Sequence, residues 1–218
     1  MEVGFDIILN AVWETLYMVS VALFCGSILG ILLGITLVVT RKGHILESKL
    51  VFSILNPIVN TFRSIPFIIL LVAIIPFTRL IVGTSIGTTA AIVPLVLHIG
   101  PYFSRLVENS LLEVDEGIIE AAKAMGATPL QIIRRFLLPE AFASLVLSVT
   151  TATISLIGAT AMAGAVGGGG LGDVAITYGY QRFDSITILV TVVLLVLFVQ
   201  IIQSIGNTLE RKLRRISS

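Results

Sequence analysis

The chain has 218 residues, of which 56% are hydrophobic and only 12% are charged. Soluble domains carry about a quarter charged residues, so this composition excludes an ordinary soluble domain, and its aliphatic richness excludes a disordered chain. A single cysteine excludes a disulfide scaffold, and a net charge of +1 gives no indication of nucleic-acid binding.

Long stretches without charged residues divide the chain. They cover residues 15–40, 80–104, 141–172 and 185–209, and residues 50–78 are interrupted only by Arg63. A bilayer core of about 30 Å needs roughly 20 helical residues. The sequence therefore predicts an all-α, polytopic membrane protein, with one domain over residues 1–218 and five spans. These predicted spans are 15–39, 57–78, 84–104, 140–165 and 185–208.

The first predicted span is expected to be retained rather than cleaved. It has no basic segment before it, and its apolar run is far longer than the core of a signal peptide. Cys25 lies inside this span, which makes redox chemistry unexpected. The second predicted span places Arg63 about two turns inside a helix, from where a long side chain can reach the interface.

Basic residues mark one side of the predicted membrane. Eleven of the fourteen lie in segments on one side, and only Arg79 and Arg182 lie on the other. The eleven are Arg41, Lys42, Lys49, Arg105, Lys123, Arg134, Arg135, Arg211, Lys212, Arg214 and Arg215. Because cytoplasmic segments of membrane proteins carry an excess of Lys and Arg, we expect a cytoplasmic C-terminus and an N-terminus outside.

The long segment between the third and fourth predicted spans has the pattern of two short helices, at about residues 115–138. Residues 116–125 are good helix formers that place Ile118, Ile119, Ala122 and Met125 on one side. Gly126 follows this helix as a left-handed cap would.

The second of these helices begins with a capping-box pattern. Thr128 precedes Pro129, and Gln131 follows three residues after Thr128. Such a helix pair either docks another protein or simply covers the end of the bundle, and small side chains at Ala121 and Ala122 favour docking because they allow a close approach.

Several residues of this segment match a known pattern. Its spacing resembles the EAA loop of bacterial ABC importer permeases, with Phe136 at the usual isoleucine position. The matching residues are Glu120, Ala121, Ala122, Gly126, Phe136, Leu138 and Pro139. Residues 60–70, 81–87 and 164–172 look like the methionine-importer permease subunit, and this resemblance covers nearly the whole chain.

The resemblance implies a type I ABC importer permease fold and a role in ATP-driven import. Methionine, or a related amino acid, would pass from an extracytoplasmic binding protein into the cytoplasm by alternating access. The implied assembly is a homodimer of the chain with two ATPase subunits in the bacterial inner membrane. Glu120, Ala121, Ala122 and Gly126 would contact an ATPase subunit, and the other matching residues would hold the second short helix to the fourth span.

Catalysis by the chain itself is not expected. The sequence lacks a G-x-x-x-x-G-K-[ST] phosphate loop, an H-E-x-x-H pattern and a cysteine cluster. We therefore expect no enzyme activity, no bound metal or cofactor and no nucleic-acid partner, with ATP and Mg²⁺ held by the partner ATPase.

Two residues are candidates for the translocation path. Arg63 could meet a substrate carboxylate or a partner subunit, or it could be an interface anchor. Met162 stands among small residues and could close a narrow passage, although ordinary packing is the alternative. His98 is expected to be a hydrogen-bonded core residue rather than a functional one.

The glycine run at residues 167–170 is predicted to form a flexible turn outside the membrane. The loop that continues to Tyr180 is expected to face the binding protein, with Asp173, Arg182 and Asp184 as candidates for polar contacts. The alternative is a solvated loop.

Other functions would fit a membrane protein of this composition. A permease for another small amino acid or a peptide would carry the same helix pair. An ion-coupled secondary transporter is less consistent, because five spans do not divide into two equal repeats and intramembrane charges are nearly absent. An assembly protein without transport activity would not need a segment suited to transmitting force.

Overall fold

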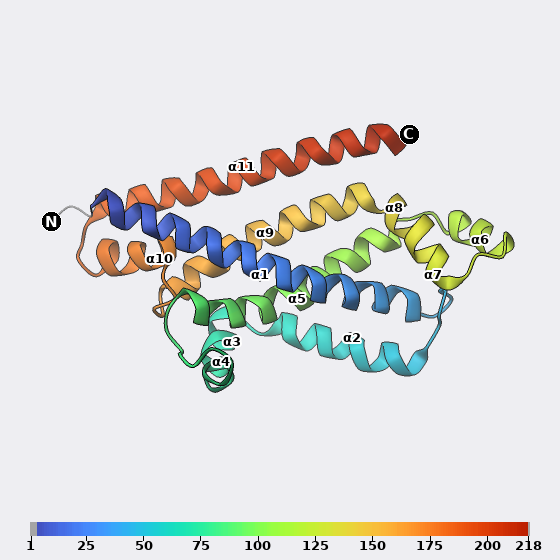
Figure 1. Cartoon of the computed structure of the whole chain (residues 1–218), viewed down its shortest axis with the longest axis horizontal. Helices are drawn as coiled ribbons and strands as arrows, with labels where there is room; N and C mark the ends of the chain where they lie inside the picture. Colours follow the sequence, from blue (N-terminus) through green and yellow to red (C-terminus); the bar gives the residue numbers. More distant parts are fainter. Residues whose placement is uncertain (1–3, 218) are drawn as a thin grey trace.

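The computed structural model describes residues 4–217, and the side chains of residues 4–214, so the Arg215 side chain lies outside this range. Among the described residues, four helices are long and apolar enough to cross a membrane. They are α1 (Phe5–Thr40), α5 (Thr88–Leu112), α9 (Phe142–Gly164) and α11 (Ser185–Ser217). All four run along the long axis of the molecule (Figure 1), so the all-α prediction is confirmed.

The second predicted span is a broken helix. It consists of α2 (Lys49–Ser64), α3 (Phe67–Ala73) and α4 (Ile75–Val82). The axes of α2 and α3 differ by 101°. The prediction of one continuous span at 57–78 is therefore wrong, and a fifth span is present only if this bent pair counts as one. Pro66 explains the break, because proline lacks an N–H and disfavours helical backbone at the preceding residue, here the extended Ile65.

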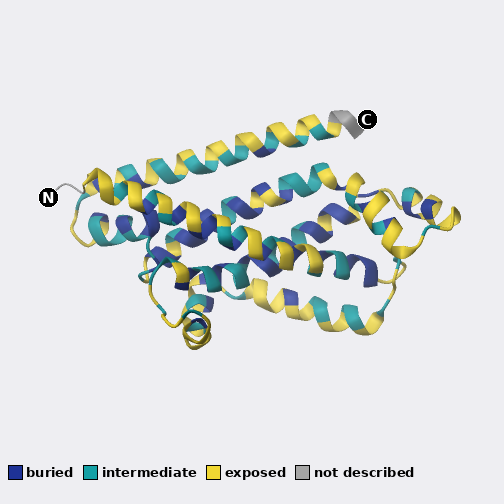
Figure 2. Ribbon diagram, in the orientation of Figure 1, coloured by how far each residue is buried: buried dark blue, intermediate teal, exposed yellow. Residues whose placement is uncertain are grey.

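Close backbone approach joins α1 to α5. Gly26, Gly30 and Gly34 are buried on one face of α1, where they meet α5. A Cβ on Gly34 would lie 2.7 Å from the carbonyl oxygen of Ser104 and from the side chain of Val107. Small residues at such spacing let two membrane helices pack at short distance. The buried residues gather along this contact (Figure 2), while α11 is exposed along much of its length.

Four short elements form one end of the bundle, which we call the α6 end. They are α6 (Glu116–Ala124), α7 (Pro129–Ile132), the π-helix η1 (Ile133–Leu137) and α8 (Leu138–Glu140). Helix α7 continues directly into η1, so the two together form one helix after α6. The prediction of two short helices is therefore confirmed. The end of α1, the start of α2 and the end of α11 lie at the same end of the molecule (Figure 1).

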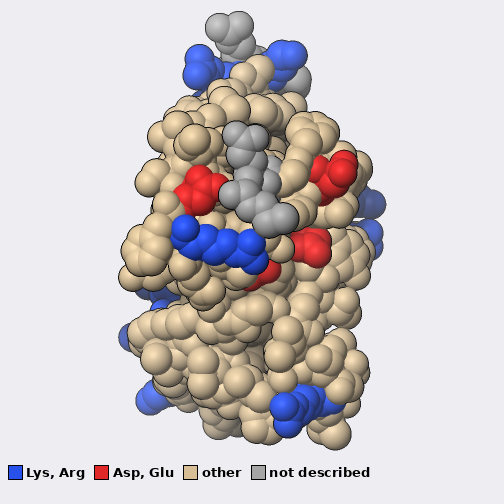
Figure 3. All heavy atoms as spheres, turned by 90° about the vertical axis from the view of Figure 1, so that its left-hand side faces the viewer, with Lys and Arg blue, Asp and Glu red and all other residues tan. Residues whose placement is uncertain are grey.

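The opposite end carries the N-terminus, and Figure 3 shows it as mostly uncharged, with acidic side chains gathered around a basic one. Here α10 (Gly170–Asp173) and the π-helix η2 (Val174–Tyr180) follow the glycine run. Residues 165–169 form a turn, with positive φ at Gly167 and Gly169, as the glycine run predicted. The predicted loop from this turn to Tyr180 is wrong, because the segment is helical and Leu171, Gly172 and Val174 are buried against neighbouring helices.

Candidate functional site

The turn between α6 and α7 has a defined backbone geometry. Asp115 caps α6 by accepting a hydrogen bond from the Gly117 N–H at 2.7 Å. Gly126 then adopts a φ of +77°, a left-handed conformation that favours glycine. The chain therefore reverses at the glycine that the sequence indicated.

A capping box starts the second helix of this pair. The Thr128 N–H donates to Gln131 Oε1 at 2.8 Å, and the Gln131 N–H donates to Thr128 Oγ1 at 3.4 Å. Two backbone donors that a helix start leaves free are thereby satisfied. The capping-box prediction is confirmed, and the relative direction of α6 and α7 is fixed by local chemistry.

One face of α6 is buried in the bundle and the other is open. Ile119 and Ala122 are buried in the same hydrophobic core as α5 and α9. Glu120 and Ala121 are exposed. The expectation that Ala122 offers a surface to another protein is therefore wrong, because its methyl group packs inward. Met125 does not share the burial of Ile119 and Ala122, with which the sequence groups it, and is 70% exposed because it is the last residue before the turn.

The second helix of the pair is anchored through its apolar residues. Ile132 and Leu137 are fully enclosed, and Phe136 and Leu138 are partly buried against the same core. Pro139 is exposed at the start of α8. The pair is thus attached to the membrane-spanning helices by packing, while the outer face of α6 and the Gly126 turn remain accessible.

A hollow beside α6 carries charges of both signs. Its charged and titratable lining residues are Lys42, His44, Glu116, Glu120 and Lys123. Burial lowers the pKa of His44 from its ordinary value, and the positive charges of Arg41 and Lys123 lower it further against an opposing effect of Glu116. This environment therefore favours the neutral form of the His44 ring.

The candidate path residues lie apart from this pair. Arg63 is exposed in the last turn of α2, directly before the bend, and not deep inside a span. Met162 is 53% exposed near the end of α9. His98 contacts aromatic rings on both sides, with its ring centre 5.1 Å from Phe67 and 6.5 Å from Tyr102.

Two of the three polar candidates at the opposite end make local hydrogen bonds. Asp173 accepts from Thr177 Oγ1 at 2.9 Å. Asp184 accepts from the Thr187 hydroxyl at 2.8 Å and from its N–H at 3.3 Å, and these bonds lower the pKa of the Asp184 carboxyl. The Arg182 guanidinium lies 4.4 Å from the centre of the Tyr178 ring.

Comparison with known proteins identifies the family. The model of the family described as binding-protein-dependent transport system inner membrane component matches residues 26–215. The chain belongs to this family.

Individual members of the family are closely similar to this chain. The probable D-methionine transport system permease protein MetI of Vibrio cholerae is 56% identical over 207 residues, which cover 95% of this chain and 92% of that protein. The D-methionine transport system permease protein MetI of Escherichia coli K12 is 53% identical over 158 residues, 72% of this chain and 73% of that one.

Solved structures agree with this membership. A structure described as an inward-facing conformation of the MetNI methionine ABC transporter matches with a TM-score of 0.94 and 49% identity, covering 96% of this chain and 97% of that chain. An amino acid ABC transporter crystallised with histidines matches with a TM-score of 0.78 at 18% identity, which shows the fold alone. The predicted ABC importer permease fold is therefore confirmed.

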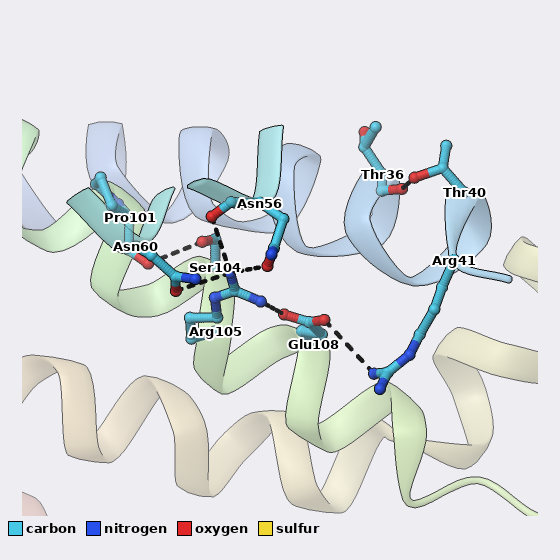
Figure 4. A network of polar contacts seen from close by, with 9 residues as sticks. All are labelled: Thr36, Thr40, Arg41, Asn56, Asn60, Pro101, Ser104, Arg105 and Glu108. Carbon is cyan, nitrogen blue, oxygen red and sulfur yellow. Dashed lines mark hydrogen bonds and ion pairs between the residues drawn. The ribbon is translucent and has the colours of Figure 1, made fainter. Parts of the chain in front are cut away.

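The structure contains a polar network on α5 that the sequence alone does not predict. From the sequence, Arg105 is one of the eleven basic residues of one side, and nothing singles out Glu108. In the structure both lie on α5 and point toward each other (Figure 4). Glu108 is only 4% exposed. The sequence does contain one indication of this pair, because a spacing of three residues places the opposite charges on one helix face.

Proposed function

We propose that this chain is the permease subunit of an ATP-driven importer that moves methionine, or a related amino acid, into the cytoplasm. The similarity to the MetI permease proteins and to the MetNI transporter supports this proposal most directly. The accessible helix pair at the α6 end agrees with it, because a transporter without an ATPase of its own needs a place where one can bind.

The exposed face of α6 and its turn are the proposed ATPase contact. Glu120 and Ala121 present one long and one short side chain there, and Gly126 holds the turn that follows. Ala122 supports this face from inside the core. Phe136 and Leu138, with Pro139 beyond them, transmit the movement of the pair to α9.

The proposed assembly contains two copies of the chain, two ATPase subunits and an extracytoplasmic binding protein. ATP and Mg²⁺ belong to the ATPase subunits. The binding protein would meet the N-terminal end, near Asp173, Arg182 and Asp184. The N-terminus then lies outside, and the C-terminus lies in the cytoplasm, in agreement with the basic residues gathered at the α6 end.

ATP binding drives the proposed cycle by favouring one arrangement of the helices. Closure of the ATPase pair moves the docked helix pairs as rigid bodies and turns the inward-open bundle outward. ATP shifts this equilibrium only as far as it binds the closed form more tightly. Arg63 beside the bend and the exposed Met162 are the proposed path residues, with Met162 as a gate.

Uptake of radiolabelled methionine by proteoliposomes tests the proposal. The vesicles would contain the purified permease and its ATPase subunit, with ATP inside and the binding protein outside. We expect ATP-dependent accumulation that unlabelled methionine abolishes and that other amino acids reduce less. Accumulation driven by an ion gradient without ATP would contradict the proposal, and accumulation of another amino acid alone would change the assigned substrate.

A further inference from the structure

Packing alone holds α2 weakly. Of its 16 residues, only Val59 is buried. Apolar side chains such as Leu50, Ile54 and Ile58 are exposed along the helix. Because helices in a bilayer are fixed against each other by close packing and interhelical hydrogen bonds, a helix with so few packed residues needs a polar attachment to keep a defined position.

The Arg105 guanidinium supplies that attachment (Figure 4). One of its nitrogens, Nη2, donates to Asn60 Oδ1 at 2.9 Å, to the Asn56 carbonyl oxygen at 3.2 Å and to Asn56 Oδ1. The two asparagines are four residues apart, so they lie on the same face of α2. A single side chain of α5 therefore binds one turn of α2.

Glu108 holds this guanidinium in place from the same helix. Its carboxylate pairs with Arg105 Nη1, and its other oxygen lies 3.8 Å from Arg41 at the end of α1. The Arg105 side chain is 14% exposed and the Glu108 side chain 5%, so both charges are largely removed from solvent. A pair of this kind is costly to disrupt, because loss of one partner leaves the other buried and unpaired.

The contact between Arg105 and α2 is connected to the proposed ATPase contact through helix α5. Helix α5 continues without a break from Arg105 to Leu112, and α6 begins at Glu116. Residues of α5 and α6 pack in one hydrophobic core. At its other end, α2 stops at the 101° bend that leads into α3. A displacement of α6 thus reaches α5 by packing and can reach α2 through Arg105.

We propose that Arg105 is a positioning residue that makes α2 move together with α5 and the ATPase contact during transport. This inference rests on the proposed function and adds to it a specific mechanical link. Arg105 Nε is buried and has no hydrogen-bond partner among the described residues, so the link to Glu108 and to α2 is made by Nη1 and Nη2.

Coupling between import and hydrolysis tests the link in the reconstituted complex. Asn60→Leu removes one acceptor from the exposed side of α2, and Asn60→Asp keeps an acceptor of the same shape. We expect Arg105→Gln and Asn60→Leu to lower the number of methionine molecules imported per ATP hydrolysed at least tenfold, with hydrolysis retained. Asn60→Asp should stay near wild type, and so should Arg41→Gln, which removes only the longer ion pair. A wild-type ratio in both Arg105→Gln and Asn60→Leu, or an equal fall of import and hydrolysis, would overturn the proposal.

A distance measurement tests this inference independently of the proposed methionine import. Spin labels at the exposed positions Ile54 and Leu112, in a Cys25→Ser background, report the position of α2 relative to the end of α5. In a permease–ATPase complex with one labelled and one unlabelled permease copy, we expect one narrow distance distribution with and without ATP, which Arg105→Gln broadens. An unchanged distribution in Arg105→Gln would contradict the link. Absence of methionine import by the wild type would instead contradict the proposed function.

Discussion

The carboxylate of Glu14 accepts a hydrogen bond from the backbone N–H of Gly170 at 2.6 Å, although 156 residues separate them in the chain. Next to it, Thr15 Oγ1 accepts the Leu171 N–H at 2.9 Å. Two side chains of α1 thereby satisfy the free donors at the start of α10. This short helix in turn lies so close to the end of α9 that a Cβ on Gly164 would meet the Asp173 nitrogen at 2.3 Å.

Replacement of Glu14 should destabilise the N-terminal end. In Glu14→Ala the buried N–H of Gly170 loses its acceptor, which costs about 1–3 kcal/mol of unfolding free energy. Glu14→Gln keeps an oxygen in the same position and should lose clearly less. Thermal unfolding of both variants in detergent measures the difference, and equal stability of Glu14→Ala and wild type would show that the bond contributes nothing.

Local signals in the sequence were sufficient for the helix pair at the α6 end. The capping box at Thr128 and the turn at Gly126 depend on residues at most four positions apart, so their geometry follows from the residues themselves. The lengths of the uncharged stretches likewise predicted four of the spans. Burial was less predictable, because the spacing of Ala122 and Met125 does not show which face of a short helix meets the core.

Contacts between distant segments could not be predicted in the same way. The glycine run predicts a turn, and only the side chains of Glu14 and Thr15 explain why a packed helix begins at its last residue, Gly170. The bend at Pro66 was hidden in a hydrophobic stretch of suitable length. Arg105 appeared as one basic residue among eleven, because its asparagine partners lie 45 and 49 positions earlier in the chain.

Replacement of Gly126 by alanine should impair coupling through backbone strain alone, without a steric clash. No atom lies within 4 Å of a Cβ built on this residue, so Gly126→Ala is penalised only through its φ of +77°. The left-handed conformation costs a non-glycine residue about 1–2 kcal/mol, which we expect to shift the turn and to lower methionine import per ATP hydrolysed several-fold.

Gly158→Ala is a matched control for this variant. Its Cβ also meets no atom within 4 Å, but Gly158 lies inside α9 and has no positive φ. Import per ATP should remain at the wild-type level in this control. If both alanine variants behave alike, the backbone conformation at Gly126 has no special role.

The contact between α1 and α5 should be sensitive to a single added methyl group. In Gly34→Ala the new carbon would lie 2.7 Å from the Ser104 carbonyl oxygen, which cannot move without displacing α5. Overpacking of this kind costs about 1–3 kcal/mol. Thermal unfolding in detergent should show the loss, whereas Cys25→Ala, at an exposed position of the same helix, should unfold like wild type.

Acidification should destabilise the α6 end through His44. Burial and the charges of Arg41 and Lys123 lower its pKa from the ordinary 6.5, so the folded chain holds the neutral ring more strongly than the unfolded chain does. This contribution to the free energy of unfolding is complete above the pKa that His44 has in the unfolded chain. It is lost as the pH falls through the pKa that His44 has in the folded chain. His44→Gln cannot be protonated and should lack this contribution to the pH dependence.

Melting temperatures at about pH 7.5 and about pH 5.5 measure this effect, because the two values lie on either side of the ordinary histidine pKa. Wild type should lose more stability than His44→Gln on acidification, and the two should differ least at the higher pH. The opposite order would mean that Glu116, which raises the pKa, outweighs burial and the two basic side chains. In that case the charged ring would stabilise the hollow beside α6, and His44 would bind a proton more tightly in the folded chain than in the unfolded one.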